Sequence, residues 1–253
     1  MDGKRLKKYL LITFLITWIC WWLEALLVKV TPLRQSDVFP MMLFVLGGFG
    51  PTIAGLICMK NGFSWKNLKE VLFPNTKRNW LIISIVIIVE TTVFLIPSNG
   101  LIDAIPRSPI AIVVAMVVFL QAGLIFGGNE EIGWRVTMLP ILEEKFAPPL
   151  ATLFVGVVWV SWHLPLWFIE GDSHQGMPFL GFAALGLALS YWLSMVYDLT
   201  GGVLFCMILH GWTNTLLGLV DIKKGPLYYI LMFAITGLAM AISIRAKRKS
   251  QVM

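Results

Sequence analysis

Long apolar runs separated by short polar stretches make up most of the 253-residue chain. A helix needs about 20 apolar residues to cross the hydrocarbon core of a bilayer. Eight runs approach this length, and we predict a spanning helix over each: about 9–29, 39–59, 80–97, 109–128, 149–169, 178–197, 201–219 and 226–244. The mixed stretch 129–145 continues the fourth helix or lies at the interface, and Pro140 would kink or end it. The predicted fold class is all-α, a polytopic transmembrane helical bundle.

Composition supports a membrane protein. Hydrophobic residues make up 58% of the chain and charged residues 13%, with a mean hydropathy of +0.81. A soluble domain would carry about 25% charged residues. We therefore expect residues 1–253 to form a single integral membrane domain, with the lipid bilayer as its first partner. The net charge of +6 does not indicate nucleic-acid binding, because the Lys and Arg residues cluster beside the apolar runs.

The distribution of basic residues predicts the orientation. An even number of spans puts both termini on one side of the membrane, and that side would hold fifteen Lys and Arg residues against five on the other. Loops rich in Lys and Arg stay in the cytoplasm, so we expect a multi-pass cell-membrane protein with both termini cytoplasmic. The apolar run after Lys8 continues without a small-residue cleavage site, which predicts an uncleaved first helix.

Polar residues inside the spans are few, and each is costly in a membrane unless it is paired. The candidates that we single out in or beside the spans are Glu90, Gln121, Glu130, Glu131, Arg135, His163, His210 and Asn214. The remaining histidine, His174, lies in the polar loop EGDSHQG and is expected to be solvated.

The sequence EEIGWR places two adjacent carboxylates one helical turn before an arginine. In a helix, Glu131 and Arg135 are four residues apart and can form an ion pair. Glu130 points about a third of a turn away, so it can face a cavity and serve as a general base. The alternative is an interfacial charge cluster at a helix end.

Two histidines occupy apolar segments. His163 lies in WVSWHLPLW, among tryptophans, and would either serve a site or donate to a backbone carbonyl, since Pro165 frees the carbonyl of about Ser161. His210 and Asn214 are four residues apart and share one helix face. They could hold a water, a metal or a substrate carbonyl, or they could form hydrogen bonds between helices. Taken together, these residues supply a base, orienting groups and oxyanion donors.

Three motifs in order carry a resemblance to a known family. EEIGWR resembles the EExxxR motif of the CPBP family, the CAAX proteases and bacteriocin-processing enzymes also called Abi proteins. WVSWH resembles the family's FxxxH motif, with Trp159 in place of Phe and His163 retained. HGWTN, with His210 and Asn214, resembles the third motif. The motifs cover about 128–215, and the first four spans carry none. The Trp substitution is expected to leave the chemistry untouched and to reshape the pocket.

The resemblance implies an intramembrane endopeptidase with its active site within the membrane. The family includes the eukaryotic CAAX prenyl endopeptidase, which removes the last three residues after a prenylated cysteine. By motif position, Glu130 would activate water with help from His163. His210 and Asn214 would stabilise the oxyanion, and Glu131 and Arg135 would support the site. The expected substrate is a peptide or a membrane-anchored protein, prenylated or not.

A metal is the main alternative for the mechanism, because the family was long described as metalloproteases. Catalytic zinc takes three protein ligands and a water, and Glu130, His163 and His210 could supply the three. Asn214 is a poor zinc ligand, and the sequence has no HExxH helix. A glutamate-activated water accounts for Asn214 without a metal, so no cofactor is favoured.

Two other functions remain open. A proton-coupled transporter would use an unpaired carboxylate inside a span, and Glu90 in IVIIVETTVF has this position. Alternatively, Glu90 pairs with a polar group on a neighbouring helix. The other is a non-catalytic bacteriocin immunity protein. Such a protein would have the same fold and no peptidase activity, and it would bind a partner in the membrane.

Overall fold

The computed structural model describes residues 2–60, 62–73, 77–102 and 109–252. Helices account for nearly all of the regular structure, which confirms the all-α class. The chain divides into two compact units. The first unit is Met1–Leu68 with Glu130–Ser190, and the second unit is Lys69–Asn129 with Tyr191–Met253. That the chain is one integral domain stays a prediction.

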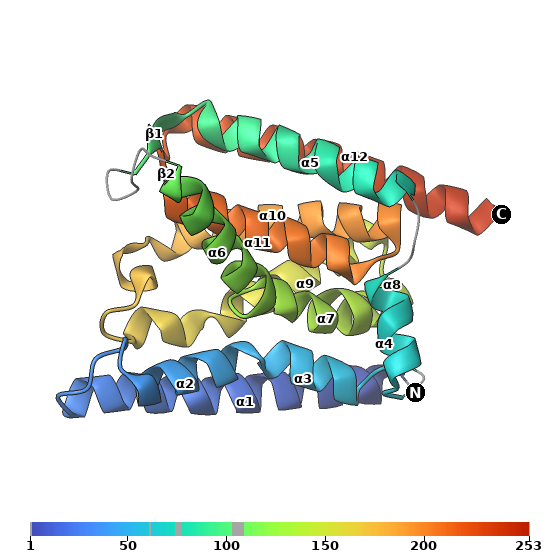
Figure 1. Ribbon diagram of the computed structural model, residues 1–253. Helices are drawn as coiled ribbons and strands as arrows, with labels where there is room; N and C mark the ends of the chain where they lie inside the picture. Colours follow the sequence, from blue (N-terminus) through green and yellow to red (C-terminus); the bar gives the residue numbers. More distant parts are fainter. Residues whose placement is uncertain (1, 61, 74–76, 103–108, 253) are drawn as a thin grey trace. The chain divides into compact units, whose positions relative to one another are not determined.

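In the first unit, α2 and α3 pack one after the other along the long helix α1 (Figure 1). Its elements, including those that extend past its boundaries, are α1 (Asp2–Val30), α2 (Val38–Gly48), α3 (Gly50–Ile57), α4 (Trp65–Leu72), η1 (Gly128–Glu130), α7 (Glu131–Gly133), η2 (Trp134–Met138), α8 (Leu139–Glu143), α9 (Pro148–Trp162), η3 (Leu164–Phe168), η4 (Ser173–Gly176) and α10 (Phe179–Thr200).

The second predicted span is a bent pair of helices. The axes of α2 and α3 meet at 41° around Phe49, and Pro51 lies in the first turn of α3, where its missing N–H is tolerated. Glycines let the pair approach α1 closely. A Cβ on Gly47 would collide with the Trp21 indole, and one on Gly50 would collide with the Thr17 hydroxyl. This close packing fixes the position of α1 beside the site described below.

The mixed stretch after Asn129 is helical as far as Glu143, but the type of helix changes along it. A 3₁₀ turn leads into the short α7, then into the π-helix η2, and finally into α8. Pro140 lies in the first turn of α8, so it marks the change from π- to α-helix. π-helical turns widen a helix locally and occur often at functional sites.

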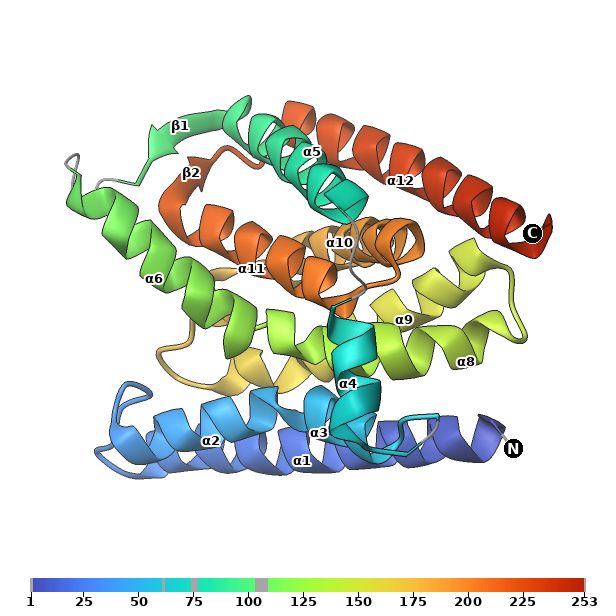
Figure 2. The same cartoon turned by 45° about the vertical axis from the view of Figure 1, so that its right-hand side comes forward.

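The second unit contains α5 (Lys77–Leu95), β1 (Ser98–Leu101), α6 (Ile110–Leu124), α11 (Val203–Leu219), β2 (Val220–Ile222) and α12 (Pro226–Val252), together with the end of α10. The strands β1 and β2 form an antiparallel pair with Ser98 opposite Ile222, which ties the end of α5 to the end of α11 (Figure 2). The sequence did not predict these strands. Helices α6 and α11 pack closely at Gly211, where a Cβ would lie 2.8 Å from the Gly123 Cα.

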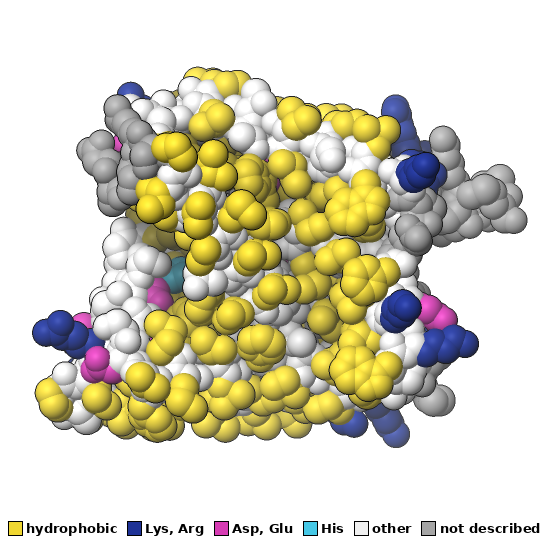
Figure 3. Space-filling view, viewed as in Figure 1, with side chains coloured by type: hydrophobic (Ala, Val, Ile, Leu, Met, Phe, Trp, Pro, Cys, Tyr) yellow, Lys and Arg dark blue, Asp and Glu magenta, His cyan; other side chains and the backbone are white. Residues whose placement is uncertain are grey.

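Among the described residues, six helices are long and apolar enough to cross a membrane. The bent pair α2–α3 is a seventh candidate, and α11 is apolar but shorter, with 17 residues. Each of the eight predicted segments overlaps one of these helices. Hydrophobic side chains cover most of the face drawn in Figure 3, as lipid contact requires.

These observations confirm a multi-pass membrane protein. The cytoplasmic location of both termini stays a prediction, and Arg107, one of the five basic residues counted on the opposite side, lies outside the described residues.

Candidate active site

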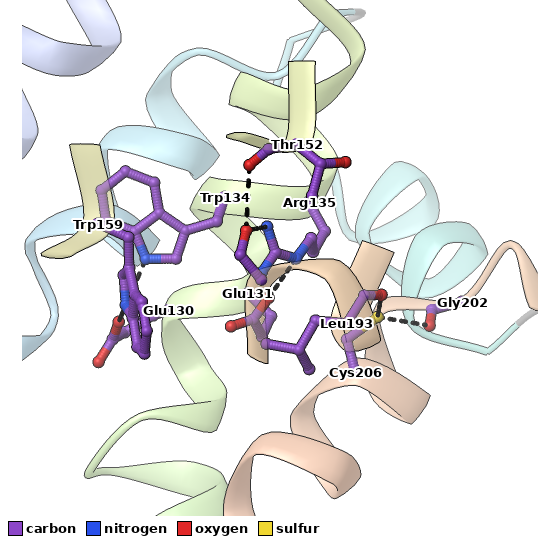
Figure 4. A network of polar contacts seen from close by, with 10 residues as sticks. Glu130, Glu131, Trp134, Arg135, Thr152, Trp159, Leu193, Gly202 and Cys206 are labelled. Atoms are coloured by element: carbon purple, nitrogen blue, oxygen red, sulfur yellow. Dashed lines mark hydrogen bonds and ion pairs between the residues drawn. The ribbon is translucent and has the colours of Figure 1, made fainter. Parts of the chain in front are cut away.

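One carboxylate oxygen of Glu130 accepts two indole hydrogen bonds (Figure 4). Trp159 Nε1 on α9 donates to Glu130 Oε2 at 2.6 Å, and Trp134 Nε1 donates to the same oxygen at 3.2 Å. Trp134 reaches Glu130 because it follows four residues later in the helical stretch. Glu130 is only 5% exposed. The two indoles therefore fix the orientation of a buried carboxyl group.

His163 directly follows Trp162, the last residue of α9, and its hydrogen bond defines its tautomer. Its ring Nδ1 lies 2.8 Å from the Trp159 carbonyl oxygen. Because a carbonyl can only accept, Nδ1 carries the hydrogen, and in the neutral ring Nε2 is the basic nitrogen. The Trp159 carbonyl is available because the backbone N–H of His163 bonds to Val160 O at 3.3 Å instead, in a tightened last turn. The acceptor is thus Trp159 and not Ser161.

Aromatic rings surround His163. The rings of Trp162, Trp159 and Phe182 lie edge-on to it, at centroid distances of 4.6, 4.8 and 5.1 Å. This packing excludes bulk water and holds the imidazole in place. Trp159 therefore connects both predicted catalytic residues of the first unit. Its indole binds Glu130, and its carbonyl orients His163.

The loop after His163 is more ordered than the sequence indicated. His174 was expected to be solvated, but its side chain is only 20% exposed and its Nδ1 lies 2.7 Å from Asp172 Oδ1. Its ring lies 5.0 Å from that of Trp167 and 6.2 Å from that of His163. The expectation failed because it considered only the local polar sequence, whereas aromatic residues of neighbouring elements cover this loop.

Asp172 links this loop to the segment between α1 and α2. Its Oδ2 accepts from Gln35 Nε2 at 2.8 Å, and its Oδ1 accepts from the His174 backbone N–H at 2.8 Å. Burial alone would raise the pKa of Asp172, but the hydrogen bonds from His174 and Gln35 outweigh it and hold the pKa below its usual range. The carboxylate therefore anchors the loop beside His163.

The ion pair expected from EExxxR is present in the first unit. Arg135 Nε lies 2.9 Å from Glu131 Oε2, and both side chains are almost fully buried. The guanidinium also donates to Ser190 Oγ at 3.5 Å, and Ser190 donates in turn to the Thr152 carbonyl at 3.3 Å. Glu131 and Glu130 thus face different partners, as their positions in a helix require.

His210 and Asn214 lie together in the second unit, on α11. Asn214 Nδ2 donates to the Phe126 carbonyl at 2.9 Å, and His210 is 2% exposed. The backbone of Gly127 lies directly against both side chains. A Cβ there would be 2.6 Å from Asn214 Nδ2 and 2.8 Å from His210 Nε2. Its φ of +134° also favours glycine.

The structure thus groups the predicted site residues in two sets, one in each unit. Glu130, Glu131, Arg135 and His163 belong to the first unit, and His210 and Asn214 belong to the second. Among the described residues, no group of three or more His, Cys, Asp or Glu side chains has an arrangement that could hold a metal ion.

Sequence reasoning missed two contributions to the site. It treated Trp159 as a variant aromatic residue and did not single out Trp134, yet both donate to Glu130. The spacing of four between Glu130 and Trp134 was the available signal. The Asp172–His174 pair could have been noticed from the spacing of two, which is typical of short side-chain to backbone turns.

Residues 108–216 match the family model described as type II CAAX prenyl endopeptidase Rce1-like. The chain is also 28% identical over 179 residues to the CAAX prenyl protease 2 of Methanococcus maripaludis, covering 67% of this chain and 65% of the relative. The chain is thus similar to the CAAX prenyl endopeptidases over the segment that contains all three motifs. It aligns with slightly less than two thirds of the relative's length.

Proposed function

We propose that the protein is an intramembrane endopeptidase that hydrolyses a peptide bond with a water activated by Glu130. The observation that carries this proposal is the double indole contact at Glu130 Oε2, together with the link through Trp159 to His163. A general base must be held in a fixed position within hydrogen-bonding distance of the water it activates. Rigid indoles hold Glu130 in this way, and the membrane-length helices keep it out of bulk solvent.

In the proposed reaction, Glu130 accepts a proton from the water while the water oxygen attacks the scissile carbonyl. The neutral form of His163 presents Nε2 as an acceptor that orients this water. His210 and Asn214 donate to the oxyanion that forms, which lowers the barrier because such donors act most strongly on developing charge. Glu130 then transfers the proton to the leaving amine as the C–N bond breaks, which completes the hydrolysis.

Chain connectivity supports the participation of His210 and Asn214. Gly127 lies against both side chains within the second unit, and only Gly128 and Asn129 separate it from Glu130. Three residues of extended chain span at most about 11 Å. The Cα atom of Glu130 therefore stays within about 11 Å of the Cα atom of the glycine that contacts the His–Asn pair.

A membrane-anchored peptide is the proposed substrate. The Methanococcus maripaludis relative is named a CAAX prenyl protease, and a prenylated peptide would meet this chain in the bilayer plane. We propose that the scissile bond of such a peptide, or of another lipid-anchored peptide, reaches Glu130 within the membrane. The reaction as proposed uses only side chains of this chain, so no cofactor is included.

The decisive experiment is cleavage of a quenched fluorogenic, farnesylated peptide by the full chain in liposomes. Wild type would be compared with Glu130→Gln, His163→Gln and His210→Gln, each with and without a chelator. We expect each variant to remain folded and to lose cleavage. Glu130→Gln should lose about 10²–10⁴-fold, the usual range for removal of a general base, and His210→Gln about 10²–10³-fold, the range for one oxyanion donor. His163→Gln should lose cleavage because the water is no longer oriented. Equal cleavage by Glu130→Gln would exclude the assignment, and loss of wild-type activity on chelation would favour a metal.

Glu90→Gln separates this function from the transporter alternative. Glu90 Oε1 accepts from Thr213 Oγ1 at 2.5 Å, which is the alternative of pairing with a polar group on a neighbouring helix. A protease should keep its cleavage activity in this variant, whereas a proton-coupled carrier should lose proton-driven uptake. Proton uptake by wild-type liposomes that depends on Glu90, without cleavage of any lipid-anchored peptide, would support the carrier.

A further inference from the structure

A cavity of about 280 Å³ lies within the second unit, and none of the residues assigned to hydrolysis is part of its lining. It is bounded by α5, α10, α11 and α12, and its lining includes Val86, Trp192, Leu209 and Ala239. Every lining residue is hydrophobic except Glu90. A wall of this composition excludes a polar or charged ligand and favours hydrocarbon.

Glu90 places a single polar feature in this apolar wall. The side chain is 3% exposed, and Oε1 accepts the hydroxyl of Thr213. The second oxygen, Oε2, is buried and has no hydrogen-bond partner among the described residues. A buried polar atom without a partner is costly, so a ligand that supplies a hydrogen bond at Oε2 would be stabilised there.

The cavity borders the lipid-facing side of two helices. Its lining includes Ile85 and Val89 on α5 and Leu238 on α12, which are 52%, 43% and 58% exposed. Helices α5 and α12 lie side by side in both ribbon views (Figures 1 and 2). A chain-like ligand could therefore enter laterally from the bilayer between these helices.

We propose that this cavity binds a single hydrocarbon chain that ends in a hydroxyl group, a long-chain or isoprenoid alcohol, with its O–H at Glu90 Oε2. The apolar wall selects the chain. The carboxyl selects the head group, because a hydroxyl donates its O–H to Glu90 Oε2, which an ether oxygen cannot do. A fatty acid would place a second carboxyl group against Glu90. The site does not depend on the proposed hydrolysis.

Photolabelling of the full chain in phosphatidylcholine liposomes tests this site. The probes would be a photoreactive sixteen-carbon alcohol and its methyl ether, which keeps the chain and the oxygen but has no donor. In wild type, we expect the alcohol to label peptides of α5 and α12 about tenfold more than the ether, the ratio that one hydrogen bond to a carboxyl group supports. Glu90→Leu should reduce this ratio to about one, and Glu90→Gln should keep part of it.

A second pair of variants tests whether the chain occupies the cavity. Ala239→Trp fills the space from α12 and should abolish labelling by both probes. Ile230→Trp, on the same helix and outside the lining, is the matched control and should label as wild type does. Val89→Trp at the exposed rim is a second blocking variant that does not disturb the core. Equal labelling by alcohol and ether in wild type would overturn the proposal, as would unchanged labelling in either blocking variant of a folded protein.

Discussion

Trp159 donates its indole N–H to Glu130 Oε2 at 2.6 Å, although the two residues lie 29 positions apart on different helical elements. The same residue accepts the ring N–H of His163 through its backbone carbonyl at 2.8 Å. A phenylalanine, the residue of the FxxxH motif at this position, could accept the His163 ring N–H through its backbone carbonyl but could not donate to Glu130. The Trp substitution therefore adds a donor to the proposed base, which its size alone would not have indicated.

Trp159→Phe should reduce cleavage while preserving the fold. The variant keeps an aromatic ring and the carbonyl that holds His163, and it removes only the hydrogen bond to Glu130. A hydrogen bond to a charged group contributes about 1.5–3 kcal/mol, so we expect kcat to fall about 10- to 100-fold. Cleavage of the farnesylated peptide in liposomes measures the change.

Trp167→Phe is the control for this variant. Trp167 also lies in the first unit, and its Nε1 donates to the Met177 carbonyl at 2.8 Å, not to a carboxyl group. It should lose some thermal stability and keep its kcat. If both substitutions reduced kcat equally, the Trp159 contact would have no specific part in catalysis.

The membrane-spanning pattern was predictable because it depends on the length of apolar runs, which is a local property of the chain. The Glu131–Arg135 ion pair was predictable for the same reason, since a spacing of four fixes two side chains on one helix face. The bend between α2 and α3 and the π-helical turn at Trp134–Met138 were not predicted. Pro51 lies in the first turn of the second helix of the bent pair, so it was an available signal for the bend.

Contacts between segments that are distant in the sequence could not be predicted from the sequence alone. The bond between Gln35 and Asp172 joins residues 137 positions apart, and the bond between Trp159 and Glu130 depends on how α9 packs beside α7. The spacing of residues could not predict that His163 and Glu130 lie in one site. The motif resemblance predicted it. That His210 and Asn214 act on the same substrate as Glu130 stays a prediction.

Arg135→Met should destabilise the protein strongly. The substitution leaves Glu131 buried without its cation, and breaking a buried ion pair from one side costs about 3–5 kcal/mol. The double variant Glu131→Gln/Arg135→Met should recover part of this loss, because the carboxylate is then neutral. Thermal unfolding in detergent measures both. Arg78→Met, at an exposed arginine that donates to the Leu199 carbonyl, should change stability little, and an equal loss there would contradict the argument.

The Asp172 carboxylate should make stability depend on pH in acid. Its pKa is lowered in the folded protein, so it stabilises the fold above its unfolded pKa of about 3.9, and this contribution is lost as pH falls through the folded pKa. The Tm difference between wild type and Asp172→Asn should therefore be constant from about pH 5 to 7 and shrink below about pH 4. His174→Phe removes one donor and should shift this loss to higher pH. A difference that grows in acid would contradict the assignment.

Gly127→Ala should impair activity more than stability. Gly127 has a φ of +134°, which strains any other residue by about 1–3 kcal/mol, and the added Cβ would also meet Asn214 Nδ2 at 2.6 Å and His210 Nε2 at 2.8 Å. Gly201→Ala is the matched control, because Gly201 has a φ of +67° and a Cβ added there would have no heavy atom within 4 Å. The control isolates backbone strain, so any additional loss in Gly127→Ala reports displacement of the His–Asn pair. If the two variants cleave the farnesylated peptide equally well, His210 and Asn214 are not needed in their observed positions.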